Sequence, residues 1–152
     1  MGRMYSAVMD NISVTTANTP QDLFELLALT NVSVLVHAVY VSQTTLTVSE
    51  LLQIKIHRGT ATGSGGGTIT PRPLETGMPG ADTLVERNNT TQSVETSLII
   101  AEDWNVVNPF IWLPPPKERI WVPGAGLFIV ELTEDASATM NVSGRVIFEE
   151  FG

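Results

Sequence analysis

Two histidines and sixteen acidic residues are the side chains of this 152-residue sequence that could hold a metal ion or move a proton. His37 and His57 lie in separate apolar stretches, each expected to be a strand. They could share a metal ion only if those strands were neighbours, because opposed Cβ atoms in a sheet lie about 5 Å apart. Alternation points His57 outward, and His37 is expected to satisfy a hydrogen bond within a packed face. The sequence therefore predicts no metal site and no cofactor.

Other catalytic arrangements are also absent from the sequence. No G-x-S-x-G motif provides a serine nucleophile. The adjacent acids Glu102-Asp103 and Glu149-Glu150 point to opposite faces if they lie on strands, which does not suit a glycosidase pair. The stretch Gly59–Gly67 is rich in glycine but lacks the lysine of a phosphate-binding loop. These observations predict a protein that is not an enzyme.

The three tryptophans suggest two kinds of binding surface. Trp104, Trp112 and Trp121 could form a platform on which sugars stack, or they could fill the core or a subunit interface, because tryptophan buries a large apolar area. The sequence leaves both alternatives open.

Charge and composition exclude several partners. The net charge is −8, and the eight lysines and arginines are scattered rather than clustered, so we expect no direct binding of nucleic acid. There is no cysteine, so there is no disulfide framework. No apolar run approaches the roughly 20 residues of a membrane span, and the opening MGRMYSAVMDN lacks the apolar region of a secretory signal.

Alternating apolar residues predict a series of short strands separated by turn signals. The composition of Asp22–Leu29 also suits a helix, but eight residues make only about two turns, so we predict a strand there. The predicted strands are Met4–Met9, Ile12–Thr16, Asp22–Leu29, Val32–Ser42, Leu52–Arg58, Leu84–Arg87, Thr96–Ala101, Phe110–Leu113, Arg119–Val122, Leu127–Leu132 and Thr139–Glu149.

This pattern predicts an all-β fold, a single antiparallel two-sheet β-sandwich over residues 1–152. A jelly roll is the favoured topology, and an immunoglobulin-like sandwich is the alternative, although no Cys…Trp…Cys pattern supports it. Val32–Ser42 is apolar on both faces, so a loop, an arm or another subunit should cover its second face. Pro114, Pro115 and Pro116 predict a stiff corner, and Gly144 predicts a bulge or a close backbone approach.

Two segments could order on contact with a partner. Residues 1–10 are a candidate N-terminal arm, with Met1–Val8 able to add a strand to a neighbour. Residues 59–80 form a long loop rich in Gly, Thr and Pro. The candidate interface residues are Met4, Tyr5, Val8, Trp104, Trp112 and Trp121.

Several short strings resemble small virion proteins encoded among the structural genes of tailed phages. They are MYSA at 4–7, DLFE at 22–25, NNTTQ at 88–92, WNV at 104–106 and FEE at 148–150, together with the Gly-Thr-Pro loop. The size, acidity and jelly-roll pattern are similar to those of capsid decoration (cement) proteins.

The resemblance implies a virion protein, made in the host cytoplasm, that binds the outer capsid surface as a homotrimer. Its partners would be the major capsid protein or other virion proteins, and it implies no catalytic residues. Two alternatives remain. One is a carbohydrate-binding or receptor-adhesion sandwich in a tail, neck or head fibre, and the other is a cupin-like enzyme.

Overall fold

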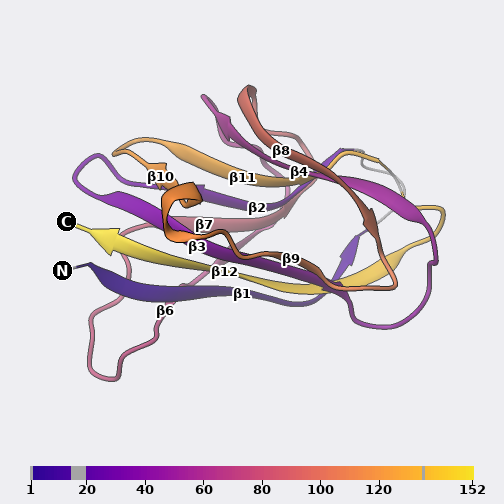
Figure 1. The fold of residues 1–152 in the computed structure, drawn as a ribbon, viewed down its shortest axis with the longest axis horizontal. Helices are drawn as coiled ribbons and strands as arrows, with labels where there is room; N and C mark the ends of the chain where they lie inside the picture. Colours follow the sequence, from indigo (N-terminus) through magenta and orange to yellow (C-terminus); the bar gives the residue numbers. More distant parts are fainter. Residues whose placement is uncertain (1, 15–19, 135) are drawn as a thin grey trace.

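Two antiparallel six-stranded sheets pack face to face in the computed structural model, which describes residues 2–14, 20–134 and 136–152 (Figure 1). The first, sheet A, has the order β10-β3-β12-β1-β6 with β9 also on β3, and the second, sheet B, has the order β5-β7-β2-β11-β4-β8. This confirms the predicted all-β sandwich. The strands are β1 (Arg3–Val14), β2 (Gln21–Leu27), β3 (Ser33–Gln43), β4 (Leu51–Gly59), β5 (Gly67–Ile69), β6 (Arg72–Pro73), β7 (Leu84–Asn89), β8 (Glu95–Asn105), β9 (Phe110–Trp112), β10 (Ile120–Val122), β11 (Leu127–Leu132) and β12 (Met140–Phe151).

The pairing of the strands is nested along the chain. Strand β1 pairs with β12, β2 with β11, β3 with β10 and β4 with β8, always antiparallel. Strands from the two ends of the sequence therefore lie side by side, and the chain folds back on itself as a whole. Strands β5, β6 and β7 come from one insertion between β4 and β8, and they extend both sheets on the same side.

The core lies between the two sheets and is built from the inward face of each strand. Tyr5 from β1 and Phe148 from β12 are fully buried and stack with ring centroids 5.6 Å apart. Phe24 and Phe128 enter the same core from sheet B. Burial of these large rings is the main favourable term that holds the layers together.

Most predicted strands occur close to their predicted bounds. Leu127–Leu132 forms β11, and most of Asp22–Leu29 is strand rather than helix, as β2 (Gln21–Leu27). The corner that the three prolines predict contains a short 3₁₀ turn, η1 (Pro116–Glu118). Proline suits the start of such a turn because its fixed φ is already helical and no donor is lost.

Two strands predicted at the N-terminus are one strand in the structure. β1 continues through Asp10 and Asn11, where the register shifts between Met9, opposite Gly144, and Ile12, opposite Val142, and where Asn11 adopts a φ of 50°. A Cβ atom added to Gly144 would lie 2.5 Å from the carbonyl oxygen of Tyr40. Gly144 is therefore a point of close backbone approach, as the sequence predicts. Thr15 and Thr16 lie outside the described residues.

The N-terminal arm predicted over residues 1–10 is instead part of sheet A; Met1 lies outside the described residues. β1 is hydrogen-bonded to β12 on one side and to β6 on the other. Tyr5 is buried, Met4 is half-buried and Val8 is exposed, which is the alternation of a strand inside a sheet. Tyr5 is consequently a core residue and not an interface residue.

The loop predicted over residues 59–80 also contains regular structure. β5 pairs with β7 at the edge of sheet B, and β6 pairs with β1 at the edge of sheet A. This segment therefore crosses between the layers and closes one side of the sandwich (Figure 1).

The placement of β1 predicts different costs for Tyr5→Ala and Val8→Ala. Tyr5→Ala should lower the free energy of unfolding by about 3–5 kcal/mol, because it leaves a cavity in the core. Val8→Ala, a change on the same strand at a site 53% exposed, should alter it by no more than about 0.5 kcal/mol. Urea unfolding of both variants measures the difference, and equally small losses would contradict the placement of β1 in the core.

Candidate functional site

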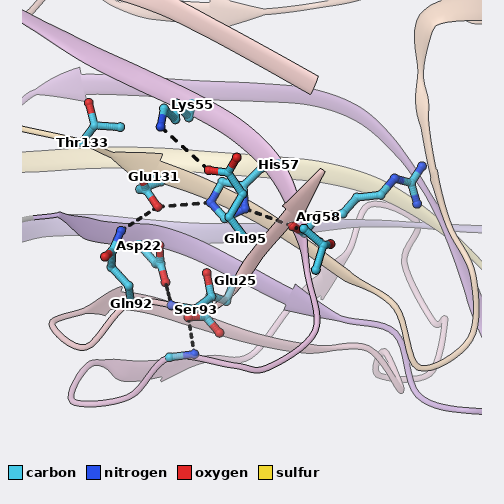
Figure 2. A network of polar contacts seen from close by, with 12 residues as sticks. Asp22, Glu25, Lys55, His57, Arg58, Gln92, Ser93, Glu95, Glu131 and Thr133 are labelled. Carbon is cyan, nitrogen blue, oxygen red and sulfur yellow. Dashed lines mark hydrogen bonds and ion pairs between the residues drawn. The ribbon is translucent and has the colours of Figure 1, made fainter. Parts of the chain in front are cut away.

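Four ionisable side chains are buried on the outer face of sheet B, the face turned away from sheet A (Figure 2). Asp22 lies on β2 with Glu25, His57 lies on β4 and Glu131 lies on β11. We refer to these four residues as the polar cluster. None of them is more than 3% exposed, and buried ionisable groups are rare unless they are paired or bind a metal.

Two loops cover the polar cluster. The backbone N–H of Gly63 donates to Glu25 Oε1 at 2.7 Å, and the N–H of Ser93 donates to Asp22 Oδ2 at 2.6 Å. Ser64 and Thr91 join the loops to each other through a pair of backbone hydrogen bonds. The carboxylates therefore accept hydrogen bonds from backbone N–H groups of the loops, and the loops exclude water from the carboxylates.

His57 lies on the outward face of its strand, as predicted, but it is fully buried there. It points away from the core residue Ile56, as alternation requires, but the loops cover that face of the sheet. The sequence could not reveal this cover, because it comes from residues distant along the chain.

Both ring nitrogens of His57 face acceptors. Nδ1 lies 3.2 Å from the carbonyl oxygen of Arg58, and Nε2 lies 3.2 Å from Glu131 Oε2. An imidazolium donates to both. Burial lowers the pKa of His57, but the hydrogen bonds with Glu131 and Arg58 and the charge of Glu131 outweigh burial, so the pKa is raised overall.

Glu131 is the acidic partner in this ion pair. Burial raises the pKa of its carboxyl group, but the hydrogen bond and the charge of His57 outweigh that effect and lower the pKa below its usual value. The side-chain amide of Gln92 also donates to Glu131 Oε2, at 2.9 Å. Glu131 is therefore held as a carboxylate at neutral pH.

Asp22 and Glu25 are a pair of neighbouring acids. Burial, together with the hydrogen bond and the charge of the adjacent Asp22, raises the pKa of Glu25 to about 7 against the opposing effects of Asn89 and the Gly63 N–H. Burial also raises the pKa of Asp22. In the described part of the chain, Asp22 Oδ1 and Glu25 Oε2 are buried and accept no hydrogen bond from any other group. The two acids can satisfy each other only when one of them holds a proton, which is the hydrogen bond that raises the pKa of Glu25.

Three members of the cluster have the arrangement of metal ligands. One ligand atom from each of Asp22, His57 and Glu131 lies within 4.8 Å of the other two. The acidic members are not among the residues predicted from the sequence, although acids inside the apolar runs DLFELLAL and LFIVEL are a usable signal. His37 is not part of this group, because it lies on β3 in sheet A and contacts Glu149 at 3.3 Å.

The three tryptophans lie in different places rather than on one platform. Trp104 is buried and is a core residue. Trp112 is half-buried and lies against Phe128, with ring centroids 6.5 Å apart. Trp121 is exposed on sheet A beside Phe151. Of the tryptophans predicted to form an interface, Trp104 is therefore excluded by burial, and Trp121 is the most accessible.

Comparisons of this chain with models of protein families, with curated proteins and with solved structures give no match. Within the described ranges, no helix has the length and apolar character needed to cross a membrane. The function is therefore inferred from the geometry of the chain itself.

The polar cluster predicts that the metal-free chain loses stability as the pH rises through neutrality. Between 4.5 and about 7, Glu25 binds a proton in the folded chain but not in the unfolded chain, so the free energy of unfolding falls across that interval. The raised pKa of His57 adds stability that is complete below 6.5 and is lost above its folded pKa. The lowered pKa of Glu131 adds stability that is lost as the pH falls below 4.5.

Melting temperatures recorded from pH 4 to 9 in a buffer with a chelator measure this profile. We expect a maximum on the acidic side of neutrality and a flatter decline in Glu25→Gln. Glu149→Gln is the matched control, because Glu149 belongs to the other sheet, and it should retain the parent slope. A parent profile that rises from pH 6 to 8 would contradict the assignment.

Proposed function

We propose that this chain is a non-enzymatic structural protein of a tailed-phage virion, a capsid decoration protein that binds the outer shell as a homotrimer. We also infer that the nested strand pairing is a jelly roll, a double-sheet arrangement common in capsid proteins. The observation that carries the proposal is the long open edge of sheet B at β8.

Strand β8 ends sheet B and is paired on one side only among the described strands. It has 11 residues, and all but Ile100 and Trp104 are exposed. Leu98 and Ile99 are exposed there, as is Val94 just before the strand. Because an open edge of this length is a template for pairing with another chain, it needs a protective partner. The other edge strands have two or three residues each.

The outer face of sheet A offers a second attachment surface. Val8 from β1, Ile111 from β9 and Trp121 from β10 are exposed apolar side chains of this sheet. A hollow of about 400 Å³ is lined by Val8, Ile111, Tyr40 and Arg145 among others. Leu35, His37 and Tyr40 of β3 are half-buried on this face, so a partner could complete the second cover expected for Val32–Ser42. An apolar patch of this kind supports binding to another protein.

These two surfaces suit a protein that binds both its own copies and a shell. In a closed ring of three copies, the contact is heterologous, so β8 of one copy meets a different surface of the next. The outer face of sheet A then remains free for the capsid, and simultaneous attachment of all copies multiplies a modest affinity. Burial of the polar cluster beneath its loops supports a role without catalysis, since a substrate does not reach side chains that are so enclosed.

The proposed trimer predicts a dependence on Leu98. Multi-angle light scattering of the purified chain should give three times the chain mass, and Leu98→Lys should shift the population to monomer by placing a charge in the contact. Leu46→Lys, a change at a site 73% exposed in the connection between β3 and β4, is the matched control and should remain trimeric. A parent that is monomeric at all concentrations would refute the trimer.

Capsid binding is tested separately. The chain should bind mature empty capsids and raise the temperature at which they disrupt, and Trp121→Asp should weaken binding by about tenfold or more without changing the melting temperature of the free chain. Co-sedimentation and differential scanning calorimetry measure the two effects. A chain that forms trimers but leaves the capsids of its own phage unbound and unstabilised would rule out the decoration role.

A further inference from the structure

We propose that the polar cluster is a binding site for one divalent transition-metal ion, with Zn²⁺ as the best-suited ion and with Asp22, His57 and Glu131 as its ligands. The site is separate from the surfaces assigned to assembly, because it lies beneath the loops on sheet B. Its role is structural: the ion joins three neighbouring strands, β2, β11 and β4.

The first argument is the imbalance of charge. Three carboxyl groups share the cluster with one imidazole. Lys55 is opposite Glu131 in the sheet and its charge helps to lower the pKa of Glu131, but its Nζ is paired with Glu95 Oε2 at 3.8 Å, outside the cluster. A buried excess of negative charge is unfavourable, and a divalent cation neutralises it more completely than a hydrogen bond does.

The second argument is independent of the charge count and concerns single atoms. Asp22 is fully buried, and its Oδ1 accepts no hydrogen bond from another group among the described residues, while its Oδ2 accepts from Ser93. Glu25 Oε2, in the same cluster, also accepts no hydrogen bond from another group, and it can satisfy Asp22 only by sharing a proton with it. When both acids are ionised, these buried lone pairs have no donor, and a cation can take the place of the shared proton. A cation bound by Asp22 gives Oδ1 a partner.

The third argument is the way His57 is held. Its Nδ1 lies 3.2 Å from the carbonyl oxygen of Arg58, which orients the ring and fixes the proton on Nδ1 when the ring is neutral. Nε2 then presents its lone pair toward Glu131 Oε2 at 3.2 Å. Metal-bound histidines usually donate their second ring nitrogen to a carbonyl or carboxylate in this way. Gln92 likewise orients Glu131 from outside the ligand set.

The ligand atoms determine the class of ion. One imidazole nitrogen and two carboxylate oxygens suit Zn²⁺ and related first-row divalent ions. Mg²⁺ and Ca²⁺ prefer oxygen ligands alone. The three ligand atoms already lie within 4.8 Å of one another, so small side-chain movements are enough to close the site around an ion.

The test uses the full chain, treated with a chelator and then titrated with ZnCl₂. Elemental analysis after gel filtration should give one zinc per chain. The melting temperature should rise by about 5–10 °C at a free Zn²⁺ concentration roughly 100 times the dissociation constant. Asp22→Asn, which keeps the size of the side chain but removes an anionic ligand, should abolish both effects.

The chain provides its own control in a second His–Glu contact. His37 and Glu149 lie 3.3 Å apart but belong to no group of three possible ligands in the described part of the chain, so His37→Gln should bind zinc as the parent does. Imidazole ¹⁵N spectra of the unchanged chain decide the matter even if Asp22→Asn does not fold. Zinc should shift the Nε2 resonance of His57 and leave His37 unaffected. No zinc in the parent, a response at His37 alone, or full binding by a folded Asp22→Asn would overturn the proposal.

Discussion

The structure depends on the burial of the centre of sheet B, at β2 and β11, from both sides. Its inner face packs on sheet A through Phe24 and Phe128, and its outer face lies beneath two loops. A sheet covered on both faces has no solvent to satisfy a polar side chain. The carboxylates of Asp22 and Glu25 therefore accept from the backbone of the loops, and that same contact holds the loops in place.

Sheet A differs from the centre of sheet B because its outer face keeps exposed apolar side chains. The proposed attachment surface lies on that face. The inner face of sheet A is a conventional core in which Tyr5 stacks on Phe148. Its outer face keeps exposed apolar side chains, with Trp121 beside Phe151. One molecule thus has a polar cluster buried beneath loops on sheet B, which favours stability of the fold. It also has an exposed apolar face on sheet A and an open edge at β8, which favour association.

Much of the fold could be predicted because it depends on local periodicity. Leu127–Leu132 is apolar except for Glu131 and becomes β11, buried on both faces. Alternation in Leu52–Arg58 predicts both the strand and the inward side of Ile54 and Ile56. The site could not be predicted, because local periodicity does not show which distant residues meet. Alternation gives the side of the sheet on which His57 lies but not what covers that side.

The sequence alone determined the fold class, most strand positions and the close approach at Gly144, because steric and hydrophobic patterns act between near neighbours. Only the tertiary structure decided that β1 lies inside a sheet rather than in an arm, and that β5 and β6 bridge the layers. It also decided that Asp22, His57 and Glu131 meet. These outcomes depend on pairing between segments far apart along the chain, and the energy of such pairing is not encoded in any single window of residues.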